Sequence, residues 1–138
     1  MVRNIGLWID HKQTYLIWSD SKNVEVIPSK VQPRERFTGG VRIGGRYNQN
    51  LDSELRHNAH YENQLSKYYE RVISTIRTAD SILVIGPGEA KREFEKALRK
   101  NKRLHKKLVK VETTDKMTKS QMVAFVRRFF SEERHTQN

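Results

Sequence analysis

The first third of the chain alternates short apolar runs with polar connections. Residues 5–10, 14–19 and 24–31 are rich in β-branched and aromatic side chains, the composition that strands prefer. The connections between them, at 10–13 and 20–23, are short enough for hairpins. The pattern therefore predicts three strands that form an antiparallel meander.

The spacing of apolar residues changes from residue 51 onward. The positions that recur at helical spacing are Leu51, Leu55, Ala59, Leu65, Tyr69, Val72 and Ile76. They predict one amphipathic helix over residues 51–77, on the order of 40 Å long at the standard rise per residue.

Two strand-helix units follow that helix. Residues 81–85 form an unbroken apolar run, which is typical of a strand covered on both faces. The sequence Gly86-Pro87-Gly88 then turns the chain into a helix whose buried side contains Ala90, Phe94, Ala97 and Leu98.

The last unit combines a strand at 108–113 with a helix from 118 to about 130. At the start of that helix, Thr118 and Gln121 make a capping-box pattern, and Met117 and Met122 occupy the hydrophobic-staple positions.

The predicted order of elements is therefore βββαβαβα, within a single domain spanning residues 1–138. We expect an α/β, ribonuclease H-like fold with a mixed five-stranded sheet, in which two parallel strands follow the meander, and three helices. Residues 135–138 are predicted to be a disordered tail.

Residues 32–50 match neither the strand spacing nor the helix spacing of apolar residues, and they are expected to form a long loop. The segment contains the doublets Gly39-Gly40 and Gly44-Gly45, and four arginines: Arg34, Arg36, Arg42 and Arg46. Such long loops usually have a function or move. Two interpretations stay open. The loop is either a flexible connection whose glycines supply turns, or a mobile projection that approaches an RNA while its arginines neutralise phosphates.

Charge is the most informative property of the composition. Lys and Arg number 27 against 16 Asp and Glu, a net charge of +11. Residues 30–46 contain five cations against one Glu, and residues 91–110 contain ten cations against two. Clustered positive charge attracts polyanions and releases counterions from phosphates, so nucleic acid is the first partner to consider and an anionic membrane surface is the weaker rival.

The basic segment at 91–110 is predicted to cover one helix and its exit. Its cations are Lys91, Arg92, Lys96, Arg99, Lys100, Lys102, Arg103, Lys106, Lys107 and Lys110. A surface helix ordinarily mixes both signs of charge. The near absence of acidic residues here favours a face that contacts phosphates through charge and shape, without reading sequence.

Other features limit the chemistry. Without cysteine there is no disulfide or thiolate nucleophile, and no apolar run is long enough to span a membrane, so we expect a cytosolic protein. Gly86-Pro87-Gly88 lacks the Gly-Lys-Ser/Thr of a P-loop, and His57 and His60 lack a third metal ligand at a diagnostic spacing. We therefore expect no cofactor and no metal.

Asp10 is the residue best placed for metal-dependent nuclease chemistry in a ribonuclease H-like fold, because it ends the first strand. The remaining carboxylates of such a set are not apparent. Asp is also a favoured turn former, which makes a structural role at the hairpin the preferred interpretation.

A meander, a basic loop with Gly44-Gly45-Arg46-Tyr47, a long helix and the strand 81–86 together resemble a known arrangement. The chain is similar to the middle domain of eukaryotic and archaeal class 1 peptide release factors and of Pelota-type ribosome-rescue proteins. In release factors this loop carries Gly-Gly-Gln, which promotes hydrolysis of peptidyl-tRNA. Here Arg46 follows the doublet and the nearest glutamine is Gln49, so what the resemblance implies is a module that faces the ribosome or tRNA.

The sequence therefore predicts a non-enzymatic RNA-binding module of the translation apparatus, with ribosomal RNA or tRNA as partner. Two alternatives stay open: an enzyme, either a divergent nuclease using Asp10 or a peptidyl-tRNA esterase using the loop, and a scaffold that binds an acidic protein. The predicted RNA-binding residues are Arg34, Arg36, Arg42, Gly44, Gly45, Arg46, Gln49, Lys91, Arg92, Lys96, Arg99, Lys100, Arg103, Lys106 and Lys107.

Overall fold

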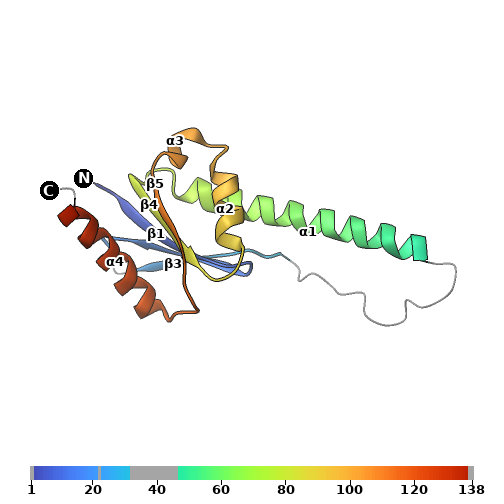
Figure 1. Cartoon of the computed structure of the whole chain (residues 1–138), viewed down its shortest axis with the longest axis horizontal. Helices are drawn as coiled ribbons and strands as arrows, with labels where there is room; N and C mark the ends of the chain where they lie inside the picture. The colour runs from blue at the N-terminus through green and yellow to red at the C-terminus, as the bar shows by residue number, and fades with distance from the viewer. Residues whose placement is uncertain (1, 22, 32–46, 137–138) are drawn as a thin grey trace.

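The computed structural model describes residues 2–21, 23–31 and 47–136, and within the last range the side chains of residues 58–132. A five-stranded sheet lies between α1, α2 and α3 on one face and α4 on the other (Figure 1). The elements are β1 Asn4–Ile9, β2 Gln13–Trp18, β3 Val24–Pro28, α1 Tyr47–Thr75, β4 Ser81–Gly86, α2 Ala90–Leu98, α3 Lys102–His105, β5 Leu108–Thr113 and α4 Lys119–Thr136.

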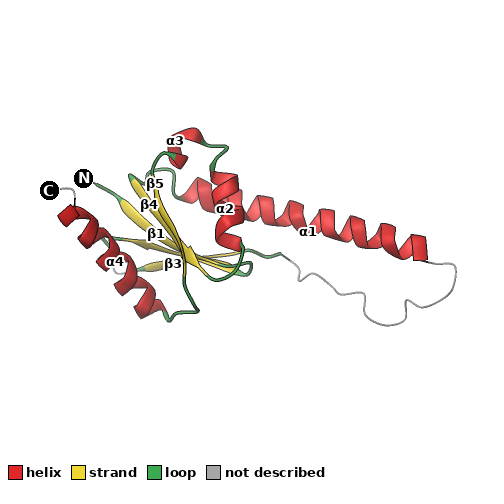
Figure 2. Ribbon diagram, viewed as in Figure 1, coloured by secondary structure: helices red, strands yellow, loops and turns green. Residues whose placement is uncertain are grey.

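The strand order in the sheet is β3-β2-β1-β4-β5. The strands β1, β2 and β3 pair antiparallel, whereas β4 pairs parallel to both β1 and β5. This arrangement confirms the predicted α/β fold with a meander followed by two parallel strands, visible in Figure 2 as one twisted layer.

The central strands alternate between two apolar cores, because successive side chains of a strand point to opposite faces. On β1, Ile5, Leu7 and Ile9 belong to the core beneath α1 and α2, while Trp8 belongs to the core beneath α4. Residues 82–85 of β4 also alternate between these two cores. The prediction that this apolar run is covered on both faces is therefore confirmed.

Two predicted helix boundaries were wrong. The helix α1 begins at Tyr47, four residues before Leu51, so residues 47–50 are helical and do not belong to the loop. A helix extends by one backbone hydrogen bond per residue and does not need apolar side chains to do so. The first turn of α1 therefore carries no apolar periodicity from which its start could be predicted. For the same reason α4 continues to Thr136, into the predicted tail.

The buried face of α1 is the predicted one at Leu65, Tyr69 and Val72, and at Ile76 just after the helix, and it differs at two other positions. Ala59 is exposed, whereas Tyr68, which the apolar pattern did not include, is fully buried. Its hydroxyl donates to the carbonyl of Asp10 at 3.1 Å and lies 2.6 Å from Thr14 Oγ1. Since Tyr68 has one proton to donate, the buried Thr14 hydroxyl donates to Tyr68.

The predicted cap of α4 is confirmed. The backbone N–H of Gln121 donates to Thr118 Oγ1 at 3.2 Å, and Gln121 Oε1 accepts the N–H of Thr118 at 2.9 Å. Met117 and Met122 both pack into the core beneath α4. The reciprocal bonds satisfy two N–H groups that the first turn of a helix leaves free.

Gly6 lets α4 pack closely on the sheet. A Cβ atom at this position would lie 2.2 Å from Val126 Cγ2. We expect Gly6→Ala to lower the free energy of unfolding by about 1–3 kcal/mol through overpacking. Adding Val126→Ala makes room for the methyl group, so the double variant should lose about 1 kcal/mol less than the sum of the single losses. Urea unfolding of the four proteins measures this, and strictly additive losses would contradict it.

Candidate nucleic-acid interface

The basic segment at 91–110 covers two helices, not one. The first, α2, ends at Leu98, and Asn101 begins α3 by accepting the backbone N–H of Leu104 at 3.2 Å. Asn101 has an extended backbone, with φ −103° and ψ 91°, and it separates α2 from a second short helix in the part of the segment that was predicted as the exit of one helix. The chain then enters β5 at Leu108.

Some cations of this segment have partners in the fold. Arg99 pairs with Glu95 at 3.6 Å, Lys110 pairs with Glu112 at 3.2 Å, and Arg103 donates to the carbonyl of Arg77 at 3.3 Å. Such exposed ion pairs contribute little to stability.

Six other cations lack a carboxylate within 4.0 Å among the residues that the structure describes. All are exposed except Lys107, which is half-buried. We call these six residues the α2–α3 cationic surface: Arg92, Lys96, Lys100, Lys102, Lys106 and Lys107.

Lys91 does not belong to this surface. Its side chain is only 3% exposed, and Nζ donates to the carbonyl of Gly88 within the turn before α2. Burying a cation requires a hydrogen-bond acceptor, and here the acceptor is the backbone. Lys91 therefore stabilises the turn and is not accessible to a phosphate in this conformation.

The remaining predicted RNA-binding residues come from the loop. Arg34, Arg36, Arg42, Gly44, Gly45 and Arg46 lie outside the residues that the structure describes. Gln49 falls in the first turn of α1.

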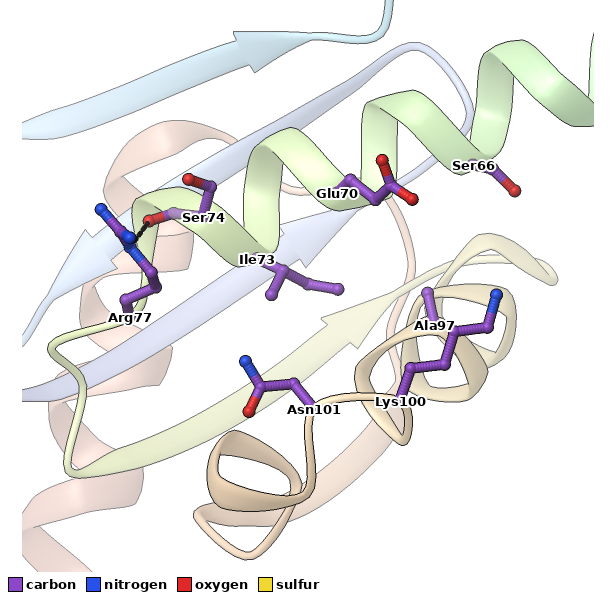
Figure 3. A pocket seen from close by; sticks show the side chains of 8 residues that line it. All are labelled: Ser66, Glu70, Ile73, Ser74, Arg77, Ala97, Lys100 and Asn101. Carbon is purple, nitrogen blue, oxygen red and sulfur yellow. Dashed lines mark hydrogen bonds between the residues drawn. The ribbon is translucent and has the colours of Figure 1, made fainter.

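A groove separates α1 from α2 and carries two adjoining hollows. The larger, of about 630 Å³, extends from His11 past Tyr61 and Tyr69 to Lys96. The smaller, of about 270 Å³, continues to Arg77 and Asn101 (Figure 3). Both hollows are lined by Ser66, Ala97 and Lys100, so they form one trough. In Figure 3 the Ile73 side chain points from α1 into the smaller hollow.

A hydrogen-bonded cluster stands at the wide end of the groove. Glu93 Oε1 accepts a bond from the Tyr69 hydroxyl at 2.7 Å and lies 2.9 Å from His11 Nε2. A carboxylate has no proton to donate, so His11 Nε2 is the donor. Because His11 follows β1, Tyr69 belongs to α1 and Glu93 to α2, the cluster ties three elements together.

Two neighbouring tyrosines of α1 have raised pKa values: Tyr69, which belongs to this cluster, and Tyr68, which does not. Burial raises the pKa of Tyr69 well above its usual range, and its bond to Glu93 and that carboxylate's charge raise it further. Burial likewise raises the pKa of Tyr68, which is partly offset by the hydrogen bond with Thr14. Both hydroxyls therefore remain protonated donors at neutral pH.

Sequence reasoning missed this cluster. Residues 11, 69 and 93 belong to no local motif, and only the packing of α1 and α2 on the sheet brings them together. A weak indication existed, because His11 and Glu93 each follow closely the carboxyl end of a parallel strand, where α/β folds gather functional groups.

Two of the residues considered for metal chemistry, Asp10 and His60, have hydrogen-bond partners within the fold, and the side chain of His57 lies outside the described ones. Asp10 Oδ1 accepts the backbone N–H groups of Lys12 and Gln13, both at 2.8 Å, which confirms its role as a turn former. His60 Nε2 accepts a bond from Gln64 at 3.1 Å. Among the side chains that the structure describes, in residues 2–21, 23–31 and 58–132, no three His, Asp or Glu are grouped as metal ligands are.

The fold is an α/β domain with a groove between α1 and α2 and with exposed cations along α2 and α3. No protein-family model matches the chain, and no curated protein matches it at a significant level. Among solved structures it is similar to the crystal structure of the archaeal translation termination factor aRF1, with 16% identity and a TM-score of 0.46, over 96% of this chain and 40% of that one. A structure described as an archaeal protein matches equally, over 39% of its length.

The chain thus spans about two fifths of the length of the solved structures that it matches. None of the described helices is long and apolar enough to cross a membrane.

Proposed function

We propose that this chain is a non-enzymatic RNA-binding module that contacts ribosomal RNA or tRNA, in translation or in ribosome rescue. The observation that carries the proposal is the α2–α3 cationic surface, whose six cations have no carboxylate partner among the described residues. Each cation that meets a phosphate releases condensed counterions, which favours binding without sequence readout.

The choice of ribosomal RNA or tRNA follows the resemblance to the middle domain of release factors. Hydrolysis is not part of the proposal, because Arg46 follows the Gly44-Gly45 doublet where that domain has glutamine. Such a module acts in the cytosol, where ribosomes and tRNA are found.

Sedimentation of a cell lysate through sucrose gradients tests the association directly. At low salt the protein should move with ribosomal particles or with tRNA, and at moderate salt it should return to the top of the gradient, because contacts with phosphates are screened. A protein that stays at the top of both gradients, and that in purified form ignores ribosomal RNA and tRNA, would disprove the proposal.

Charge removal tests the surface itself. Replacing Lys102, Lys106 and Lys107 with Gln should weaken RNA binding by roughly 10- to 100-fold at low salt and make the slope of log K against log salt shallower by about 2–3. The control removes three positive charges from residues 116–128, with Lys116→Gln, Lys119→Gln and Arg128→Gln. Equal losses in both variants would show that net charge alone, not this surface, attracts the RNA.

A further inference from the structure

The groove between α1 and α2 is long and open at the protein surface. Its lining residues on α1 run from Asn58 to Ser74, which corresponds to roughly 24 Å at the helical rise per residue. Pockets for small molecules enclose most of a compact ligand. A trough that follows a helix for this distance suits an extended polymer better than a compact ligand.

The wide end of the groove offers an aromatic wall. Tyr61 is half-buried, and its ring centroid lies 6.5 Å from that of His11, with the two planes at 70°. A nucleobase that stacks on such a ring gains about 1–3 kcal/mol, whatever the base. The nearby Asn58 amide and Glu62 carboxylate supply donors and acceptors suited to the edge of a base.

Glu93, on the α2 side of the groove, is bonded to Tyr69 and His11, and two lysines beyond it supply positive charge to this side of the groove. Lys96 and Lys100 line it, lie one helical turn apart and belong to the α2–α3 cationic surface. Lysines that have no carboxylate partner among the described residues are suited to phosphates. The groove therefore combines a stacking wall on α1 with cations on α2, which is the pairing that single-stranded nucleic acids require.

We propose that this groove holds single-stranded RNA, with an unpaired base against Tyr61 and backbone phosphates beside Lys96 and Lys100. The inference rests on the proposed RNA binding and adds a preference to it. A base within a duplex is already stacked on both sides, so only an unpaired base can reach the Tyr61 ring. The protein should therefore favour unpaired RNA over duplex RNA.

Fluorescence anisotropy tests this preference with a labelled RNA of about ten nucleotides, a length within the usual range of single-strand sites, alone and annealed to its complement. The wild-type protein should bind the single strand at least about tenfold more tightly than the duplex. Tyr61→Leu, which keeps an apolar side chain against the core, should weaken single-strand binding by about 5- to 100-fold and leave duplex binding unchanged. Tyr61→Phe keeps the aromatic ring and should bind within about twofold of the wild type.

The outcomes separate this inference from the proposed function. If single strand and duplex bind equally and Tyr61→Leu changes neither, the groove does not hold RNA, while binding to the cationic surface stands. If neither RNA binds, the proposed function fails with it. Binding of an acidic peptide in place of RNA would overturn both and favour a protein partner.

Discussion

Replacing Gly86 with alanine should lower the free energy of unfolding by roughly 3 kcal/mol or more, because it combines backbone strain with a steric clash. Gly86 ends β4 with φ at +150°, a conformation that residues with a side chain rarely adopt. An added Cβ would lie 2.3 Å from the carbonyl oxygen of Ile9. That oxygen belongs to the backbone of the neighbouring central strand, which cannot move without disturbing the pairing of β1 with β4.

Gly88, two residues later in the same turn, provides the matched control. Its φ of +64° also favours glycine, but an added Cβ would meet no atom within 4 Å. Gly88→Ala should therefore cost only the left-handed backbone penalty, about 1–2 kcal/mol. Urea unfolding followed by tryptophan fluorescence compares the two variants, since Trp8 and Trp18 are both buried. Equal losses would show that contact with Ile9 does not decide the choice of glycine.

The requirement at Gly86 also changes how the turn is interpreted. A strand that ends in Gly-Pro-Gly before a helix suggests an anion site at the helix N-terminus. In the structure, Gly86 is required because the carbonyl oxygen of Ile9 leaves no room for a side chain. Lys91 donates to the carbonyl of Gly88 within the turn. The positive charge available to a ligand lies instead along α2 and α3 and the residues that follow each of them, from Arg92 to Lys107.

The parts of the fold that could be predicted are those fixed by local periodicity and capping. The covered run at 81–85 and the Thr118–Gln121 cap depend on side chains within a few residues of one another, so the pattern contains the cause. Helix ends without apolar residues, as at Tyr47, contain no such pattern.

The candidate site was harder to predict because tertiary contacts decide which side chains are available. Lys91 and Arg92 are neighbours with the same charge in the sequence, yet one is buried against Gly88 and the other is exposed. Likewise, only the packing of α1 on β2 shows that Tyr68 reaches Thr14. Composition located the positive charge in residues 91–110, but it could not show which of these basic side chains are buried in the fold and which are exposed.

The second large effect concerns alkaline solution. The free energy of unfolding should fall steeply above about pH 10, by up to about 2.7 kcal/mol per pH unit. Burial raises the pKa of Tyr68 and Tyr69 in the folded protein, whereas both titrate near pH 10 when unfolded. Above that pH the unfolded chain releases two protons that the folded chain keeps. The folded state therefore binds more protons, and stability decreases as the pH rises.

Urea unfolding at several pH values between about 9 and 11.5 measures the slope, and two variants assign it. Tyr69→Phe removes one of the two ionisable hydroxyls, so the slope should become shallower by about 1.4 kcal/mol per pH unit, and Tyr68→Phe should do the same. Both variants also lose hydrogen bonds, to Glu93 or to Thr14 and Asp10, which lowers stability at every pH without changing the slope. A double variant that keeps the wild-type slope would show that other groups cause the alkaline loss.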